Sequence, residues 1–233
     1  PRGCGPRPSH PRAAVPVALP QRLGHRAVHR VRDERSADAV DAGEAVGDAL
    51  AVTHHVAGSL GGGGFMIVRL ADGTTKAVDF REIAPAKATV ALNEKQLAEG
   101  AHGYLSAPVP GVGGGLELAH ERFGSQPRAG LIEPAIALAE DGHRYGERQS
   151  IVLNWFWKRL SKHDGSLRAL LGREPAHDQP IQAGHLLKQR SLAKTLRAVR
   201  DHGKDGFYAG EVAEKIAKAH ADKEGVSIEK ARV

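Results

Sequence analysis

Four consecutive glycines, Gly61–Gly64, constrain the fold of this chain more than any other feature. Because glycine has no Cβ, such a run lets neighbouring backbone segments approach closely. A P-loop continues into Gly-Lys-Ser/Thr, and a dinucleotide-binding loop lies between a strand and a helix. Here the order is reversed, since a helical pattern precedes the glycines and a strand pattern follows them. We therefore expect close backbone packing at this run rather than a phosphate cradle.

The helical pattern before the glycines predicts a helix over Ala39–Val52, because apolar residues recur there at the spacing of one helix face. That expected core face consists of Ala42, Ala45, Val46, Ala49 and Leu50.

A β-hairpin is expected after the glycines. Strands over Phe65–Leu70 and Thr75–Arg81 flank an Asp72-Gly73 turn, a strong hairpin signal because glycine tolerates positive φ. Side chains alternate between the faces of a strand, so Arg81 is predicted near a strand end, on the face opposite Val78 and Phe80.

The remainder of the chain is predicted to be mostly helical, with apolar residues in the fourth segment repeating at i, i+4 and i+7. The expected helices cover Gly113–Phe123, Ile132–Asp141, Ser150–Lys162, Ser191–His202 and Glu211–Ala221.

Residues 1–39 are rich in Pro and Arg and lack helical or strand periodicity, so we expect a disordered tail preceding a body over residues 40–233. A high-GC gene read in a shifted frame would give a similar Lys-free composition. The stretch Ala13–Leu19 is short and interrupted by Pro16, so no signal peptide is recognisable. The single cysteine, Cys4, excludes a disulfide framework.

The net charge of +6 is concentrated in that tail. Residues 1–40 hold eight of the 33 basic residues and three of the 27 acidic ones, so the body is nearly neutral. We therefore expect no nucleic-acid partner for the body. No apolar run reaches the roughly 18 residues of a membrane helix, and no membrane span is expected.

Seven segments, in order and in spacing over residues 40–220, resemble the N-terminal portion of the large subunit of the γ-glutamyltranspeptidases. They are Ala39–Ala42, Ala57–Met66, Asp79–Pro85, Val109–Gly111 with Gly114–His120, Glu133–Ile136 with Leu138–Gly142, Leu192–Leu196 and Gly206–Glu211.

This resemblance implies an α+β fold, an incomplete αββα sandwich of the N-terminal nucleophile hydrolase type with a helix-rich C-terminal part. It implies a precursor that cleaves itself, so that a new N-terminal Thr attacks the γ-carbonyl of glutathione or another γ-glutamyl compound, with the freed α-amine as base. The small subunit from the same precursor is the implied partner. No cofactor and no metal is implied, and the location is expected to be periplasmic or extracellular.

The implied nucleophile is not found in this sequence, so we assign no catalytic residue and expect the chain to be inactive alone. None of the threonines considered lies in the nucleophile motif of the family: Thr53, Thr74, Thr75, Thr89 and Thr195.

Arg81 is the candidate substrate-binding residue. By resemblance it is the arginine that binds the α-carboxylate of the substrate, and a guanidinium matches a carboxylate with two parallel hydrogen bonds. The alternative is a structural arginine paired with Asp79, Glu82 or another acid.

Two other functions remain open from the sequence. A cephalosporin-type acylase fragment would share the fold, and a non-catalytic binding module would use the basic tail for salt-sensitive DNA binding. The pair His54-His55 lacks a third metal ligand at suitable spacing and is interpreted as structural. The aromatic run Trp155–Trp157 is predicted to pack in the core or between domains.

Overall fold

The computed structural model describes residues 39–70, 72–85, 89–90, 94, 107–162, 164–171 and 180–224. The disorder predicted for the tail therefore falls outside the described residues, apart from Ala39, which begins a helix.

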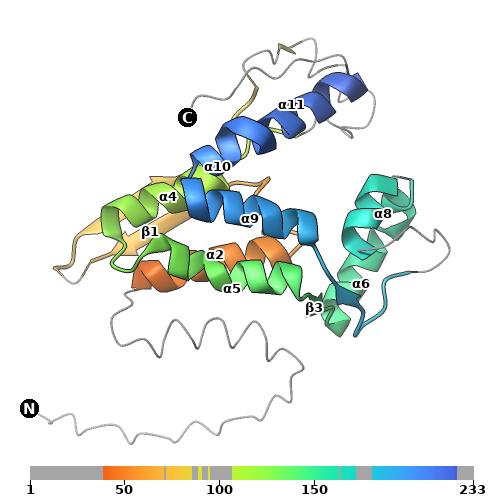
Figure 1. The fold of residues 1–233 in the computed structure, drawn as a ribbon, viewed down its shortest axis with the longest axis horizontal. Coiled ribbons are helices and arrows are strands. Elements are labelled where there is room, and N and C mark those ends of the chain that lie inside the picture. Colours follow the sequence, from red (N-terminus) through yellow and green to blue (C-terminus); the bar gives the residue numbers. More distant parts are fainter. Residues whose placement is uncertain are drawn as a thin grey trace, which may run out of the picture.

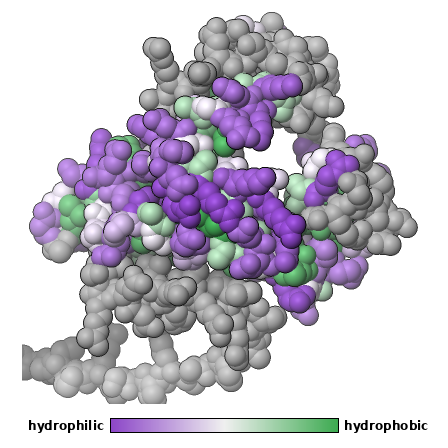
Figure 2. Space-filling view, in the orientation of Figure 1, coloured by the Kyte–Doolittle hydropathy of each residue, from purple (hydrophilic) through white to green (hydrophobic). Residues whose placement is uncertain are grey.

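Three helices run side by side through the middle of the molecule: α2 (Ala39–Thr53), α5 (Arg128–Glu140) and α9 (Arg190–His202) (Figure 1). We call these three, together with the elements packed on them, the helical body. Its main core consists of Ala49, Ala51, Val52, Leu60, Ile132, Ala135, Ile136, Leu138, Ala139, Ala193, Leu196, Val199 and Phe207. The outer side of α9 carries Arg190, Lys194, Arg197 and Arg200, and hydrophilic side chains dominate this face in Figure 2.

The predicted helix over Ala39–Val52 is confirmed, but the face that it buries differs from the expected face. Leu50 is 43% exposed, while three acidic residues, Asp41, Glu44 and Asp48, are buried. They recur at i, i+3 and i+7, so they form one stripe along the helix.

The hairpin is confirmed with shorter strands. β1 (Phe65–Arg69) pairs antiparallel with β2 (Thr75–Asp79), Phe65 lying opposite Asp79, and Gly73 has φ 86° in the turn. β2 ends two residues before Arg81, so the prediction that Arg81 lies within the strand is wrong.

The helix α4 (Val112–Phe123) packs on α2 and β2, and the short helix α10 (Asp205–Tyr208) leads into α11 (Gly210–Glu224). The hydroxyl of Tyr208 accepts a hydrogen bond from the backbone N–H of Gly114 at 3.0 Å and donates one to the carbonyl of Pro110 at 2.9 Å. These bonds fasten α10 to the start of α4.

A smaller unit lies at the opposite end of the molecule from the hairpin (Figure 1). It contains α6 (Glu147–Trp155), α7 (Trp157–Leu160) and α8 (Asp164–Leu171), which we call the outer lobe. A two-stranded pair, β3 (His143–Arg144) and β4 (Leu186–Leu187), connects it to the helical body, and we call this pair the neck. The lobe has its own core, formed by Tyr145, Leu153, Leu167, Leu170, Leu171, Ile181 and Leu187.

Two predictions fail in the outer lobe. The single helix expected over Ser150–Lys162 is broken at Phe156, whose ψ of 3° ends α6 before α7 begins. Trp155 is 76% exposed and Phe156 47% exposed, so core packing is wrong for both, whereas Trp157 packs against the lobe core.

Among the described residues, no helix combines the length and the apolar character that crossing a membrane requires.

Candidate substrate-binding site

The glycine run lies between two other backbone segments, one after β2 and one before α4. The carbonyl of Gly62 accepts hydrogen bonds from the N–H groups of Gly111 at 2.8 Å and Val112 at 3.1 Å. Gly64 and Phe80 exchange two backbone hydrogen bonds, of 3.2 and 3.0 Å. These bonds to Phe80, the residue before Arg81, hold the segment that carries Arg81 against the glycine run.

Close approach explains why glycine occupies these positions. A Cβ on Gly63 would lie 2.6 Å from the backbone nitrogen of Glu82 and 2.7 Å from the carbonyl oxygen of Phe80. A Cβ on Gly111 would overlap that same carbonyl oxygen. The expected role of the glycine run in close backbone packing is confirmed, and β1 follows it as predicted.

Arg81 begins the exposed loop after β2. Its backbone N–H donates to Oδ1 of Asp79 at 3.0 Å, which fixes the turn out of the strand. Its Nε lies 3.2 Å from Oε2 of Glu82, and its guanidinium carbon lies 6.0 Å from the ring centroid of Phe65. The side chain is 68% exposed.

Both interpretations of Arg81 find support in this geometry. Glu82 pairs with it, as the structural alternative anticipates. Yet Glu82 engages the Nε edge, and among the described residues no other acid bonds to the guanidinium. The side chain is largely exposed, and a carboxylate bound at its two terminal nitrogens would form charge-assisted hydrogen bonds. Because β2 ends at Asp79, strand alternation does not set the side on which Arg81 lies, and its role in substrate binding stays a prediction.

The buried acidic stripe on α2 is a second cluster of functional side-chain types, and the sequence reasoning missed it. Oδ1 and Oδ2 of Asp41 accept hydrogen bonds from the N–H and hydroxyl of Ser125, at 2.9 and 2.5 Å. Oε2 of Glu44 lies 2.9 Å from Nδ1 of His120, and Oδ2 of Asp48 lies 2.6 Å from Nη1 of Arg128. Burial raises the pKa of Asp48, and the Arg128 guanidinium opposes that rise.

One part of this cluster has the spacing of a metal site. Ligand atoms of Asp41, Glu44 and His120 lie within 4.8 Å of one another. However, Ser125 and His120 already engage these carboxylates, and Arg128 supplies a positive charge beside them. We interpret the cluster as a polar network that joins α2 to α4 and α5.

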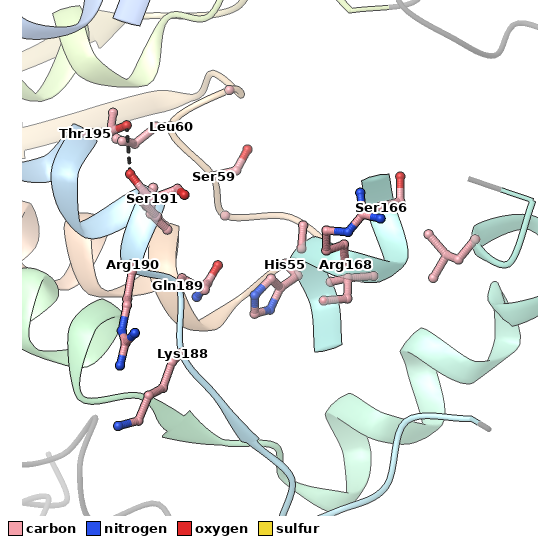
Figure 3. A pocket seen from close by; sticks show the side chains of 17 residues that line it. His55, Ser59, Leu60, Ser166, Arg168, Lys188, Gln189, Arg190, Ser191 and Thr195 are labelled. Atoms are coloured by element: carbon pink, nitrogen blue, oxygen red, sulfur yellow. Dashed lines mark hydrogen bonds between the residues drawn. The ribbon is translucent and has the colours of Figure 1, made fainter. Parts of the chain in front are cut away.

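A groove of about 1070 Å³ lies beside the loop that leads from α2 into the glycine run. Ser59 and His55 line it from the loop after α2, Arg168 from α8 and Ser191 from α9 (Figure 3). His55 packs against His143 of the neck, with ring centroids 5.6 Å apart, so its interpretation as a structural histidine agrees with its surroundings.

Two of the threonines considered in the sequence make local hydrogen bonds. Oγ1 of Thr53 donates to the carbonyl of Ala49 at 2.9 Å, and Oγ1 of Thr195 to that of Ser191 at 3.3 Å. Both bonds lie within a helix, four residues apart in sequence.

Comparison with known proteins supplies the context for this geometry. The Gamma-glutamyltranspeptidase family model matches residues 34–231. A glutathione hydrolase proenzyme of Pseudomonas sp. (strain A14) is 42% identical over 184 residues, which are 77% of this chain and 32% of that protein. The chain therefore spans about a third of the length of that relative.

Solved structures agree in fold. The γ-glutamyltranspeptidase of Helicobacter pylori matches with a TM-score of 0.76 and 38% identity, over 91% of this chain and 61% of that chain. A cephalosporin acylase from Bacillus halodurans matches with a TM-score of 0.73 over 89% of this chain and 39% of that chain. Its identity is 24%, so this second likeness concerns the fold alone. The α+β, N-terminal nucleophile hydrolase fold is confirmed in incomplete form, helix-rich and with short strands.

Proposed function

This chain belongs to the γ-glutamyltranspeptidase family, and from that premise we propose that it contributes the group that binds the glutamyl end of γ-glutamyl compounds. The observation that carries the proposal is the exposed guanidinium of Arg81, anchored at its Nε edge and free of described partners at its terminal nitrogens.

Anchoring on one edge suits a carboxylate clamp. The pair with Glu82 and the ring of Phe65 restrict the rotation of a long side chain, so less conformational entropy is lost when a substrate binds. A substrate α-carboxylate would then accept two parallel hydrogen bonds from the remaining fork.

The remaining chemistry belongs to parts of the protein that these residues do not span. There the hydroxyl oxygen of an N-terminal Thr would attack the γ-carbonyl carbon, and the amide C–N bond would break as the amine leaves with a proton. Water or an acceptor amine would then cleave the γ-glutamyl ester. In this proposal the small subunit of the same precursor supplies the Thr. The periplasmic or extracellular location stays a prediction.

The test is the Arg81→Lys substitution in a complete precursor that carries these residues. Lysine keeps the charge but loses the planar fork, so we expect KM for a γ-glutamyl anilide to rise about 10- to 100-fold. Steady-state kinetics measures this change.

Arg69→Lys is the matched control, since Arg69 is an exposed arginine of the same hairpin, at the far end of β1. It should leave KM unchanged. An Arg81→Lys enzyme with unaltered KM would contradict the proposed role.

The acylase alternative rests on a shared fold, and a substrate pair separates it from the proposed function. A transpeptidase should cleave a γ-glutamyl anilide in preference to a glutaryl anilide, which lacks the α-amine. The reverse preference would favour an acylase.

A further inference from the structure

The outer lobe is attached to the helical body through a narrow connection. The chain leaves the body after α5, forms the lobe, and returns before α9, so both crossings pass through the neck. The N–H of Gln189 donates to the carbonyl of Ala139 at 2.7 Å and closes the neck on the body side. Because each neck strand has two residues, side-chain contacts beside the neck contribute much of what fixes the position of the lobe.

One of these contacts is a pair of stacked histidines. His143 of β3 is 5% exposed, and its ring lies 5.6 Å from the ring of His55, with 22° between the planes. Among the described residues, neither ring nitrogen of His143 has a hydrogen-bond partner, and Nε2 of His55 is also buried without one. Nδ1 of His55 lies 3.3 Å from Nε2 of Gln149 on α6.

Among the residues that the structure describes, the groups around this pair offer no counter-ion. The ring of Tyr145 lies edge-on to His143 and tilted to His55, and its hydroxyl donates to the carbonyl of Leu170 at 2.7 Å. His185 in turn stacks on Tyr145. His54 neighbours it on the loop after α2, Gln189 approaches from the segment before α9, and Arg168 and Lys188 line the same groove as His55 (Figure 3). These neighbours are neutral or basic.

We propose that the His55–His143 stack is a pH-sensitive joint, which holds the outer lobe against the helical body while both rings are neutral and loosens when either ring gains a proton. A protonated ring here would be a buried charge with no acid partner in the described part of the chain, next to a second ring that can also ionise.

Because the pair is buried, acidification should open the neck rather than close it. Burial lowers the pKa of His143 to about 4, with a further contribution from His55. Burial also lowers the pKa of His55, an effect that His54 reinforces and Gln189 opposes. In an opened neck the rings regain an ordinary pKa near ~6.5. The opened form therefore binds more protons between these values, and each pH unit of acidification in that window favours opening by up to about tenfold.

Hydrogen exchange of the full 233-residue chain tests the proposal at about pH 7.5 and about pH 5, corrected for intrinsic exchange rates. The reporting amides are those of Tyr145, Gly184 and Gln189, which bond across or beside the neck. We expect their protection to fall at least about tenfold on acidification, while amides in the middle of α5 and α9 keep theirs.

His143→Phe keeps an aromatic ring that cannot ionise, so it should remove most of this pH dependence. His202→Gln is the matched control, because His202 is exposed at the end of α9, and it should retain the wild-type response. A wild-type neck with pH-independent protection would overturn the proposal, as would an undiminished response in His143→Phe.

A second measurement needs no variant. Ring chemical shifts of His143 should titrate in the folded chain far below the ordinary histidine midpoint, and an ordinary midpoint would also overturn the proposal.

Discussion

Gly111 shows how a single missing side chain sets the position of Arg81. Its backbone lies against the carbonyl of Phe80, the residue before Arg81, and a Cβ there would overlap that oxygen. Its N–H also bonds to Gly62, so the glycine run, the Arg81 segment and the start of α4 meet at this point. Gly43 of α2 has open space around its Cβ position and provides a contrast.

Gly111→Ala should therefore lower the free energy of unfolding by about 1–3 kcal/mol or more, because backbone atoms must move to accommodate the methyl group. Gly43→Ala, in a helix interior, should raise it by roughly 0.5–1 kcal/mol. Denaturant unfolding of both variants measures the difference. Equal effects would show that close approach is not what requires glycine at position 111.

Some properties of the site could be predicted at the residue scale. Strand alternation correctly predicted Val78 on the buried face of β2, but it could not place Arg81, because β2 ends at Asp79. The pairing of Arg81 with Glu82 was one of several alternatives. Burial of Asp41, Glu44 and Asp48 could not be predicted, since acids at helical spacing usually mark a solvated face. Their partners Ser125, His120 and Arg128 lie some 80 residues away in sequence.

At the scale of elements, α2 is joined to α5 by charge as well as by apolar packing. Arg128 lies at the first position of α5 and reaches Asp48 at 2.6 Å and Glu44 at 4.0 Å. Removing one member of a buried pair leaves the other charge without its partner, which costs more than the pair contributes.

Asp48→Ala should lower the free energy of unfolding by about 3–5 kcal/mol for this reason. Lys215→Ala removes the exposed pair with Glu211 on α11 and should change it by less than about 0.5 kcal/mol. Thermal or urea unfolding compares the two. An Asp48→Ala loss as small as that of Lys215→Ala would show that the buried pair does not hold α2 on α5.

Elements with a long hydrophobic period were predictable from the sequence, and short ones were not. The hairpin and the helices α2, α4, α5, α9 and α11 repeat their pattern over several turns or alternations. β3 and β4 have two residues each, too few for any period, and they pair only because α5 and α9 bring their ends together.

Pro134 favours a helix start nearby, yet α5 begins six residues before it.

Among the described residues, the two largest apolar cores are separate, one in the helical body and one in the outer lobe. Leu196 of α9 is fully buried in the first, and Leu167 of α8 is fully buried in the second. Since the neck is the main covalent route between them, the lobe should be able to lose structure while the body keeps it.

Leu167→Ala should destabilise the lobe by about 2–5 kcal/mol and speed amide exchange in α6 and α8, with little effect on α5. Leu196→Ala should speed exchange in the helical body. Site-resolved hydrogen exchange measures both. If Leu167→Ala accelerated exchange in α5 as much as in α8, the two cores would unfold as one unit.

The assignment of Arg81 to the substrate α-carboxylate is tested most directly by kcat/KM of wild type and Arg81→Gln in a complete precursor. The substrates are a γ-glutamyl anilide and a 4-aminobutyryl anilide, which keeps the amine but lacks the α-carboxylate. If Arg81 binds that carboxylate, the substitution lowers kcat/KM for the γ-glutamyl compound by about 100-fold and leaves the 4-aminobutyryl value nearly unchanged. An equal loss on both substrates would contradict the assignment.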